Sequence, residues 1–139
     1  MKTIPLRALV VDDAEITRFA AARFLEEFDI ETDESKSYDE TMEILKGTEL
    51  DNSKRYEFVV LDWQLSKLET AEGIIQWLRQ YQPECKIIVL SGKFDEFSGG
   101  CIKGEAHCPA NRLNADYFIS KPTKLVHLKE ALLSLSLIK

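Results

Sequence analysis

The chain has 139 residues, of which 45% are apolar and 30% are charged, and its formal net charge is -6. This length and composition predict one globular domain, residues 1–139, that buries a core of its own. The acidic charge disfavours nucleic-acid binding, and the sequence contains no apolar run long enough to span a membrane and no signal-peptide core, so we expect a cytoplasmic protein.

In chain order, the first half of the sequence predicts two strand–helix units. Residues 6–11 are a short apolar run that ends on Asp12 and Asp13. Residues 14–28 predict a helix, since they carry apolar side chains at helical spacing: Ile16, Phe19, Ala20, Phe24 and Phe28. Residues 30–35 predict a polar edge strand. The sequence SYDE at 37–40 is a capping box, which predicts a second helix that ends near Gly47.

The second half continues the alternation after a polar loop at 48–55. Residues 58–61 predict a buried strand, and residues 73–81 predict a helix closed by Pro83, with its inward side chains at Ile74, Trp77, Leu78 and Tyr81. Residues 86–90 and 117–120 predict two further strands. Residues 125–138 predict a last amphipathic helix, with Leu128, Leu132 and Leu135 in the core.

Strands separated by helical segments predict a parallel α/β sheet with helices on both faces. Ligands of such sheets bind at the carboxyl ends of the strands. The residues at those ends are three carboxylates, a hydroxyl and an amine: Asp12, Asp13, Asp62, Ser91 and Lys121. We therefore expect these five side chains to meet at one edge of the sheet.

This set of side chains predicts phosphoryl chemistry that depends on a metal ion. Clustered carboxylates repel one another unless a cation lies between them, and Mg²⁺ or Mn²⁺ suits such oxygen ligands. Lys121 and Ser91 would contact phosphoryl oxygens. Asp62, at the end of a buried strand, is placed as the nucleophile that would form an aspartyl-phosphate.

With these residues, the chain resembles the receiver domains of two-component response regulators, of the chemotaxis type. The resemblance covers nearly all of the chain, through the motifs VVDD (10–13), VVLDWQL (59–65), VLSG (89–92) and FISKP (118–122). It implies a flavodoxin-like, doubly wound sheet of five parallel strands in the order 2-1-3-4-5.

The resemblance also implies roles for individual residues. Asp12, Asp13 and Asp62 would hold the metal with the backbone carbonyl of Gln64, and Asp13 would be a direct ligand. Asp62 would be the phosphoacceptor. Ser91 and Lys121 would contact the phosphoryl group, and Ser91 would form the switch together with the aromatic Phe118. Gln64 and Lys93 would influence the phosphate lifetime.

Some positions depart from the family pattern. Ser66 stands where receivers commonly have a proline, Gly92 stands where they have alanine, and Phe118 lacks the hydroxyl of the common tyrosine. The spacing from Ser91 to Lys121 is long, and residues 92–115 have a poor helical pattern. We expect the fourth helix to be short, shifted or partly replaced by a loop, with a turn or two of helix within residues 105–113.

The three cysteines are an odd number for a cytoplasmic protein, so free thiols are the default expectation. The cluster Cys101, His107 and Cys108 also admits a zinc site or a redox-sensitive thiol pair. Its spacing is not a standard zinc pattern, and the sequence shows no evident fourth ligand.

Three other functions compete with the phosphoacceptor. A dehalogenase-type enzyme would need an acid at the position of Gln64, and a flavodoxin-like electron carrier would need a hydroxyl-rich and glycine-rich loop where this chain has DDAEIT. A degenerate receiver that binds proteins without phosphorylation is the main alternative. The intact set of five residues at the strand ends argues against it.

The resemblance implies partners rather than enzymatic turnover. The donor would be a sensor histidine kinase or a histidine phosphotransfer protein, and a downstream protein would recognise the phosphorylated state. About 17 residues follow Pro122, so we expect output through protein binding, through phosphate relay, or through an effector module outside this sequence. The sequence leaves phosphorylation-dependent homodimerisation open.

Overall fold

The structure is a computed structural model that describes residues 5–92 and 99–139. These ranges contain six strands: β1 (Arg7–Val11), β2 (Glu31–Ser35), β3 (Phe58–Asp62), β4 (Lys86–Ser91), β5 (Gly100–Ile102) and β6 (Tyr117–Ser120). They also contain five α-helices: α1 (Glu15–Glu26), α2 (Tyr38–Gly47), α3 (Glu72–Tyr81), α4 (Pro109–Leu113) and α5 (Leu125–Ser134). A short 3-10 helix, Asn52–Lys54, precedes β3. None of the helices in these ranges is both long and apolar enough to cross a bilayer.

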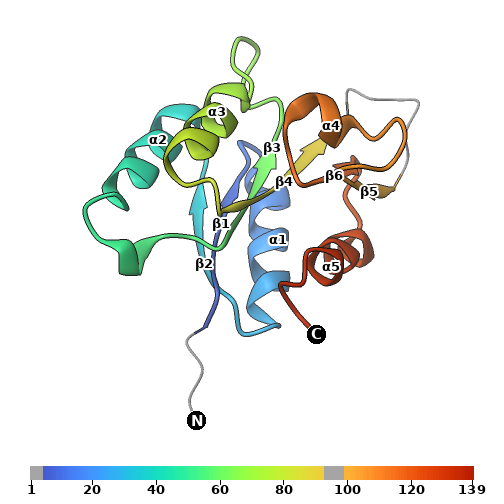
Figure 1. The fold of residues 1–139 in the computed structure, drawn as a ribbon, viewed down its shortest axis with the longest axis horizontal. Helices are drawn as coiled ribbons and strands as arrows, with labels where there is room; N and C mark the ends of the chain where they lie inside the picture. Colours follow the sequence, from blue (N-terminus) through green and yellow to red (C-terminus); the bar gives the residue numbers. More distant parts are fainter. Residues whose placement is uncertain (1–4, 93–98) are drawn as a thin grey trace.

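The strands form one sheet in the order β2-β1-β3-β4-β6-β5 (Figure 1). The first five strands in this order are parallel, which confirms the predicted α/β sheet. The fifth of them, β6, is the strand that the sequence predicted over residues 117–120. The sixth strand, β5, pairs with β6 in the antiparallel sense and lies at the sheet edge. Sequence patterns do not predict this strand, because three residues, Gly-Cys-Ile, are too few for a recognisable strand pattern.

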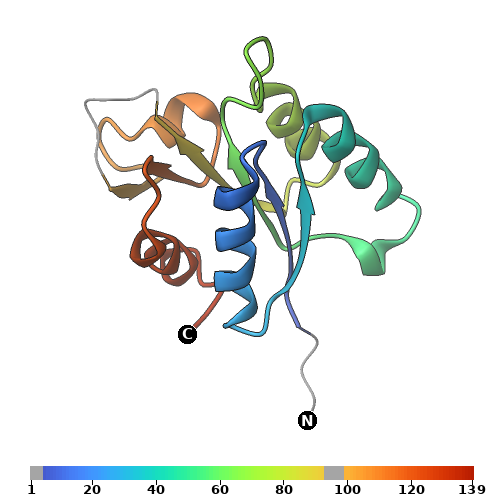
Figure 2. The same cartoon turned by 180° about the vertical axis from the view of Figure 1, so that it is seen from behind.

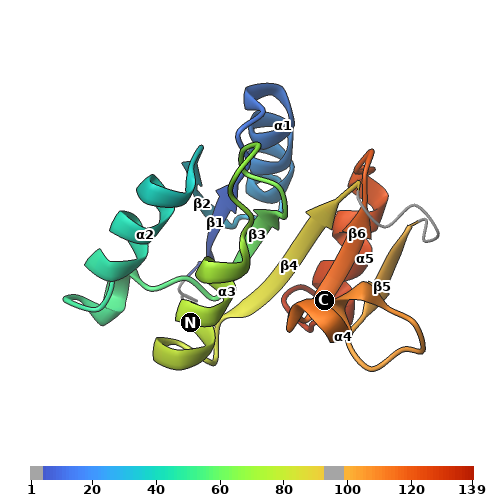
Figure 3. The ribbon, with the colours of Figure 1, turned by 90° about the horizontal axis from the view of Figure 1, so that it is seen from above.

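Helices cover both faces of the sheet, as expected. Helices α1 and α5 pack on one face (Figure 2), and α2, α3 and α4 pack on the other (Figure 3). Alternate strand residues feed the two cores: Val59 and Leu61 face α2 and α3, whereas Val60 faces α1 and α5. Because both faces are covered, the central strands β1, β3 and β4 are almost continuously apolar, and their polar residues lie at their ends, whereas the edge strand β2 is polar, as predicted.

Local signals set the helix ends. Ser37 Oγ accepts a hydrogen bond of 3.1 Å from the Glu40 N–H and so caps α2. The Glu40 carboxylate accepts from the Lys36 N–H, one residue outside the expected capping box. Helix α3 ends at Tyr81, before Pro83, as predicted.

The inward faces of the helices differ from the prediction in detail. Ile16 is 86% exposed and Phe19 is 50% exposed, because α1 packs through its small inner face of Ala21, Ala22 and Leu25. Tyr81, expected inside, is 48% exposed at the end of α3. Helix α5 ends at Ser134 rather than at residue 138, and Ser136 has a positive φ of 60°.

The region after β4 confirms one expectation and overturns another. Helix α4 has only five residues, as the poor helical pattern of residues 92–115 predicted. Free cysteines were the wrong expectation, because Cys101 and Cys108 form a disulfide with a Cα–Cα distance of 5.9 Å. The turn after β5 returns the chain and brings the two residues within bridging distance. The two sulfurs are bonded to each other, so they do not form a zinc site with His107. Cys85 is a free, buried thiol.

Candidate phosphoacceptor site

Two carboxylates follow β1. Asp12 is almost fully buried, and its Oδ1 accepts a hydrogen bond of 2.9 Å from the Ala14 N–H. Asp13 is exposed. A further residue on α1, not among the predicted site residues, supports Asp12: Arg18 donates to the Asp12 backbone carbonyl at 2.9 Å and pairs with Glu34 at 3.1 Å. The order of residues along the chain carried no signal for that contact.

Asp62 is the last residue of β3 and is buried beside them. One carboxylate oxygen from each of Asp12, Asp13 and Asp62 lies within 4.8 Å of the others. The prediction that the strand ends would bring these three acids together is confirmed. Asp62 is the central member by topology, since β3 lies between β1 and β4.

Lys121 approaches the carboxylates from the end of β6. Its Nζ lies 3.0 Å from Asp62 Oδ1 and 3.6 Å from Asp12 Oδ2. The backbone N–H of Lys121 donates to the Ser91 carbonyl at 3.0 Å, and the peptide bond to Pro122 is cis. Ser91 is buried at the end of β4. The five predicted residues therefore lie on one edge of the sheet.

The electrostatics of this edge favour a bound cation. Burial and the neighbouring Asp12 carboxylate raise the pKa of Asp62 to about 6, although Lys121 opposes this shift. Asp12 Oδ2 is buried and accepts no hydrogen bond from residues 5–92 or 99–139. One lysine cannot neutralise three carboxylates. A buried carboxylate oxygen without a donor, beside two further acids, fits the oxygen ligands that Mg²⁺ takes.

Gln64 lies in the loop after β3 and forms an isolated antiparallel bridge with Thr70. The hydrogen bonds of this bridge belong to the neighbours: Leu65 N–H donates to Glu69 O, and Ala71 N–H donates to Trp63 O. The bridge therefore does not use the Gln64 carbonyl. The Gln64 side-chain amide donates to the carbonyls of Ser66 and Glu69 within its own loop.

Ser66 closes the same loop. Its Oγ accepts from the N–H groups of Leu68 at 3.2 Å and Glu69 at 3.0 Å, and its own N–H donates to the Glu69 carbonyl. A proline at this position would lack that N–H. The residue that departs from the family pattern, Ser66, therefore makes backbone and side-chain hydrogen bonds within this loop.

Phe118 lies on β6, three residues before Lys121, and its side chain is fully buried. It belongs to the core between the sheet and helices α3 and α4, together with Val89. In the antiparallel register of the edge strand, Cys101 is opposite Phe118. Lys93, which the resemblance placed beside the site, lies outside the described residues.

Comparisons with known proteins identify the family. The family model of the response regulator receiver domain matches residues 8–133. The chain therefore belongs to the receiver domain family of two-component signalling. Receiver domains bind Mg²⁺ at an acidic pocket, and this chain has such a cluster of acids. They are generally not enzymes. A search of curated proteins found no match.

Solved structures of low sequence identity share the fold. A response regulator receiver protein from Burkholderia phymatum is 22% identical, with a TM-score of 0.74, over 96% of this chain and 97% of that one. A CheY-like receiver domain protein from Methanospirillum hungatei is 17% identical, with a TM-score of 0.72, over 95% of this chain and 94% of that one. The chemotaxis protein CheY4 of Vibrio cholerae is 16% identical, with a TM-score of 0.69, over 94% and 98% of the two chains.

Proposed function

We propose that Asp62 accepts a phosphoryl group from the phosphohistidine of a sensor histidine kinase or a histidine phosphotransfer protein. The observation that carries this proposal is the contact between Lys121 Nζ and Asp62 Oδ1 at 3.0 Å, within a cluster of three carboxylates. Lys121 keeps one oxygen of Asp62 oriented, and burial keeps water away from it. The nucleophile is therefore held in place before the donor arrives.

The transfer balances as a single displacement on phosphorus. A carboxylate oxygen of Asp62 forms the new bond to phosphorus, and the bond from phosphorus to the donor histidine nitrogen breaks. The electron pair of that bond stays on the imidazole, which takes up a proton. Lys121 and the Ser91 hydroxyl lie at the ends of neighbouring strands, where they would contact the phosphoryl oxygens. Later hydrolysis of the acyl-phosphate resets Asp62.

Asp12, Asp13, Asp62 and the carbonyl of Gln64 would hold Mg²⁺ or Mn²⁺. When bound, this ion supplies positive charge that offsets the charge developing on the phosphoryl oxygens. Asp12 is fixed by Ala14 and Arg18, so it enters the site already oriented. The loop that ends in the Gln64–Thr70 bridge leaves the Gln64 carbonyl free of the bridge hydrogen bonds.

The signal would leave the site through β4 and β6. Ser91 and Lys121 are joined by a backbone hydrogen bond, and Phe118 lies on the strand that carries Lys121. We infer that residues 1–139 act as one cytoplasmic receiver unit. Phosphorylation would change the surface formed by β4, α4, β6 and α5, which a downstream protein recognises. The same surface change would also allow a second form of output, in which two phosphorylated chains form a homodimer through this surface.

The test uses acetyl phosphate as a small donor with Mg²⁺, followed by intact mass measurement. The wild-type chain should gain one phosphoryl group, and the gain should disappear with EDTA and in Asp62→Ala. Glu43→Gln, which removes an exposed carboxylate on α2, should gain phosphate like the wild type. Equal labelling of Asp62→Ala would contradict the proposal. If neither acetyl phosphate nor a phosphohistidine donor labels the wild type, the degenerate receiver becomes the better account.

A further inference from the structure

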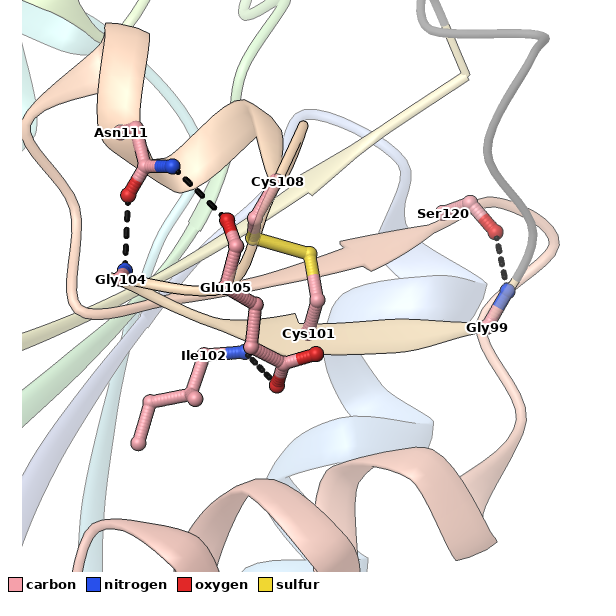
Figure 4. Close-up of a disulfide and its surroundings, with 8 residues drawn as sticks. All are labelled: Gly99, Cys101, Ile102, Gly104, Glu105, Cys108, Asn111 and Ser120. Atoms are coloured by element: carbon pink, nitrogen blue, oxygen red, sulfur yellow. Dashed lines mark hydrogen bonds between the residues drawn. A yellow bond between two sulfur atoms is a disulfide. The ribbon is translucent and has the colours of Figure 1, made fainter.

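A disulfide joins the antiparallel edge strand to the start of α4. It connects Cys101, in the middle of β5, with Cys108, the residue immediately before the first turn of α4 (Figure 4). Both cysteines are 1% exposed, and both belong to the core cluster that contains Phe118. Of the residues between them, Ile102 is half-buried, and Lys103 to His107 are exposed. A surface loop therefore covers a buried sulfur–sulfur bond.

The two elements that the disulfide joins are too short to be stable by themselves. Strand β5 has three residues and α4 has five, and helices of this length are marginal without tertiary support. Asn111 adds two hydrogen bonds to the loop, accepting from the Gly104 N–H and donating to the Glu105 carbonyl. The antiparallel ladder holds β5 against β6, and the disulfide adds the covalent constraint that fixes this short strand to the start of α4.

This edge is connected directly to the phosphoacceptor site. Gly99 and Ser120 exchange two hydrogen bonds, since the Gly99 N–H donates to Ser120 Oγ at 2.9 Å and the Ser120 N–H donates to the Gly99 carbonyl at 2.9 Å. The next residue is Lys121, whose Nζ lies 3.0 Å from Asp62. A displacement of β5 therefore acts on the end of the strand that positions Lys121.

The third cysteine differs in both position and chemistry. Cys85 precedes β4, at the end of that strand opposite Ser91, and burial raises the pKa of its thiol to about 12. A thiol that stays protonated is a poor nucleophile in disulfide exchange. Cys85 is therefore an internal reference that should take no part in exchange within the folded chain.

We propose that Cys101 and Cys108 are a reversible thiol–disulfide site, reduced by a dithiol, and that its oxidised form increases phosphoryl binding at Asp62. The second half of this inference rests on the proposed function. The oxidised edge holds Lys121 and Ser91 in their places before the ligand binds, so binding costs less ordering. Coupling is reciprocal, so a phosphoryl group at Asp62 should also favour the disulfide over the dithiol by the same factor.

The exchange balances as two displacements on sulfur. A thiolate of the reductant attacks one cysteine sulfur, and the Cys101–Cys108 bond breaks as a mixed disulfide forms. The second thiol of the reductant then displaces the remaining cysteine and leaves as an intramolecular disulfide. Two electrons and two protons pass from the dithiol to the chain. Opening of the exposed loop between the cysteines gives the reductant access to the sulfurs.

The experiment has two readouts on the full chain. First, the protein is equilibrated in buffers that contain reduced and oxidised dithiothreitol in graded ratios, then quenched in acid, unfolded and alkylated. The mass then reports one modified cysteine for the oxidised form and three for the reduced form. Second, beryllofluoride, a phosphoryl mimic, is titrated with Mg²⁺ against the fluorescence of Trp63 in both forms. Cys101→Ser/Cys108→Ser repeats the reduced state without reductant, and Cys85→Ser is the matched control.

We expect reversible conversion between one and three modified cysteines, and an affinity for beryllofluoride at least about fivefold lower in the reduced form. Beryllofluoride should change the equilibrium constant between the dithiol and disulfide forms by that same factor, in favour of the disulfide. A pair that stays oxidised in every buffer, or equal beryllofluoride affinity in the two forms, would overturn this inference and leave the proposed function intact. If neither form binds beryllofluoride, the proposed function fails, and the coupling fails with it.

Discussion

The ammonium of Lys121 lies 3.0 Å from a carboxylate oxygen of Asp62 and is the nearest positive charge to that residue among the described contacts. It also reaches the buried oxygen of Asp12 at 3.6 Å, so one side chain from β6 spans the ends of β1 and β3. The lysine offsets only part of the negative charge, because three carboxylates share the site. This partial neutralisation determines how the isolated chain should respond to pH, to metal and to substitution.

The raised pKa of Asp62 predicts that Asp62→Asn stabilises the metal-free chain at neutral pH. The folded chain holds the Asp62 proton up to about pH 6, whereas an unfolded aspartate loses it near pH 4. The stability that this difference contributes is present below about pH 4 and is lost as the pH rises through about 6. Asp62→Asn should therefore raise the free energy of unfolding at pH 7 by on the order of 1–3 kcal/mol, and by much less at pH 4.

Urea unfolding in EDTA at several pH values measures this difference. Glu43→Gln, on the exposed surface of α2, serves as the control and should not reproduce the pH-dependent gain. Saturating Mg²⁺ should reduce the advantage of Asp62→Asn, because the ion offsets the repulsion in the wild type. A variant that is less stable than the wild type at pH 7 without metal would show that the Lys121 contact outweighs burial.

Asp13 provides the second prediction, since it is the exposed member of the carboxylate cluster. If its carboxylate is a metal ligand, Asp13→Asn should weaken Mg²⁺ binding by at least about tenfold, the loss that even indirect partners of a metal often cause. Glu15→Gln removes a charge two residues away without removing a proposed ligand, and it should change the affinity much less. Titration with Mg²⁺, followed by the fluorescence of Trp63, measures the affinity of both variants. Equal losses of Mg²⁺ affinity in the two variants would show that Asp13 contributes negative charge and is not a metal ligand.

Two glycines near the site should differ in the stability that each loses on substitution by alanine. A Cβ on Gly92 would lie 3.8 Å from the Lys121 Cβ, an ordinary contact, so Gly92→Ala should change the free energy of unfolding by less than about 1 kcal/mol. A Cβ on Gly100 would lie 2.7 Å from a ring carbon of Tyr117. Gly100→Ala should therefore cost about 1–3 kcal/mol, because the buried Tyr117 ring or the edge strand must shift to make room for the methyl group. Urea unfolding measures the free energy of unfolding of both variants. Equal losses of stability in Gly92→Ala and Gly100→Ala would contradict the packing described for β5.

The sequence predicted the parallel strands and the strand-end residues well, because each lies in a segment that local chemistry specifies. The run from Phe58 to Leu61 is apolar on both faces and ends on a charge, which is the pattern of a strand covered on both sides. The capping box at Ser37 located the start of α2 for a similar reason. Proximity of the five site residues then followed from the rule that parallel strands end on one edge.

The features that were missed depend on contacts between distant residues. Strand β5 is defined by its pairing with β6, and a three-residue segment carries no periodicity. The disulfide depends on the turn that follows β5, whereas the count of three cysteines favoured free thiols. The exposed Ile16 and Phe19 follow from the close packing of α1 through alanines, which apolar spacing alone does not reveal.

The most direct test of the account locates the phosphoryl group on the chain. After labelling with acetyl phosphate and Mg²⁺, borohydride reduction converts an aspartyl-phosphate to homoserine, and peptide mass spectrometry identifies the converted position. We expect conversion of Asp62, with Asp12 and Asp13 unchanged, and no conversion when EDTA is present. Conversion at Asp12 or Asp13 in place of Asp62 would contradict the assignment of Asp62 as the phosphoacceptor.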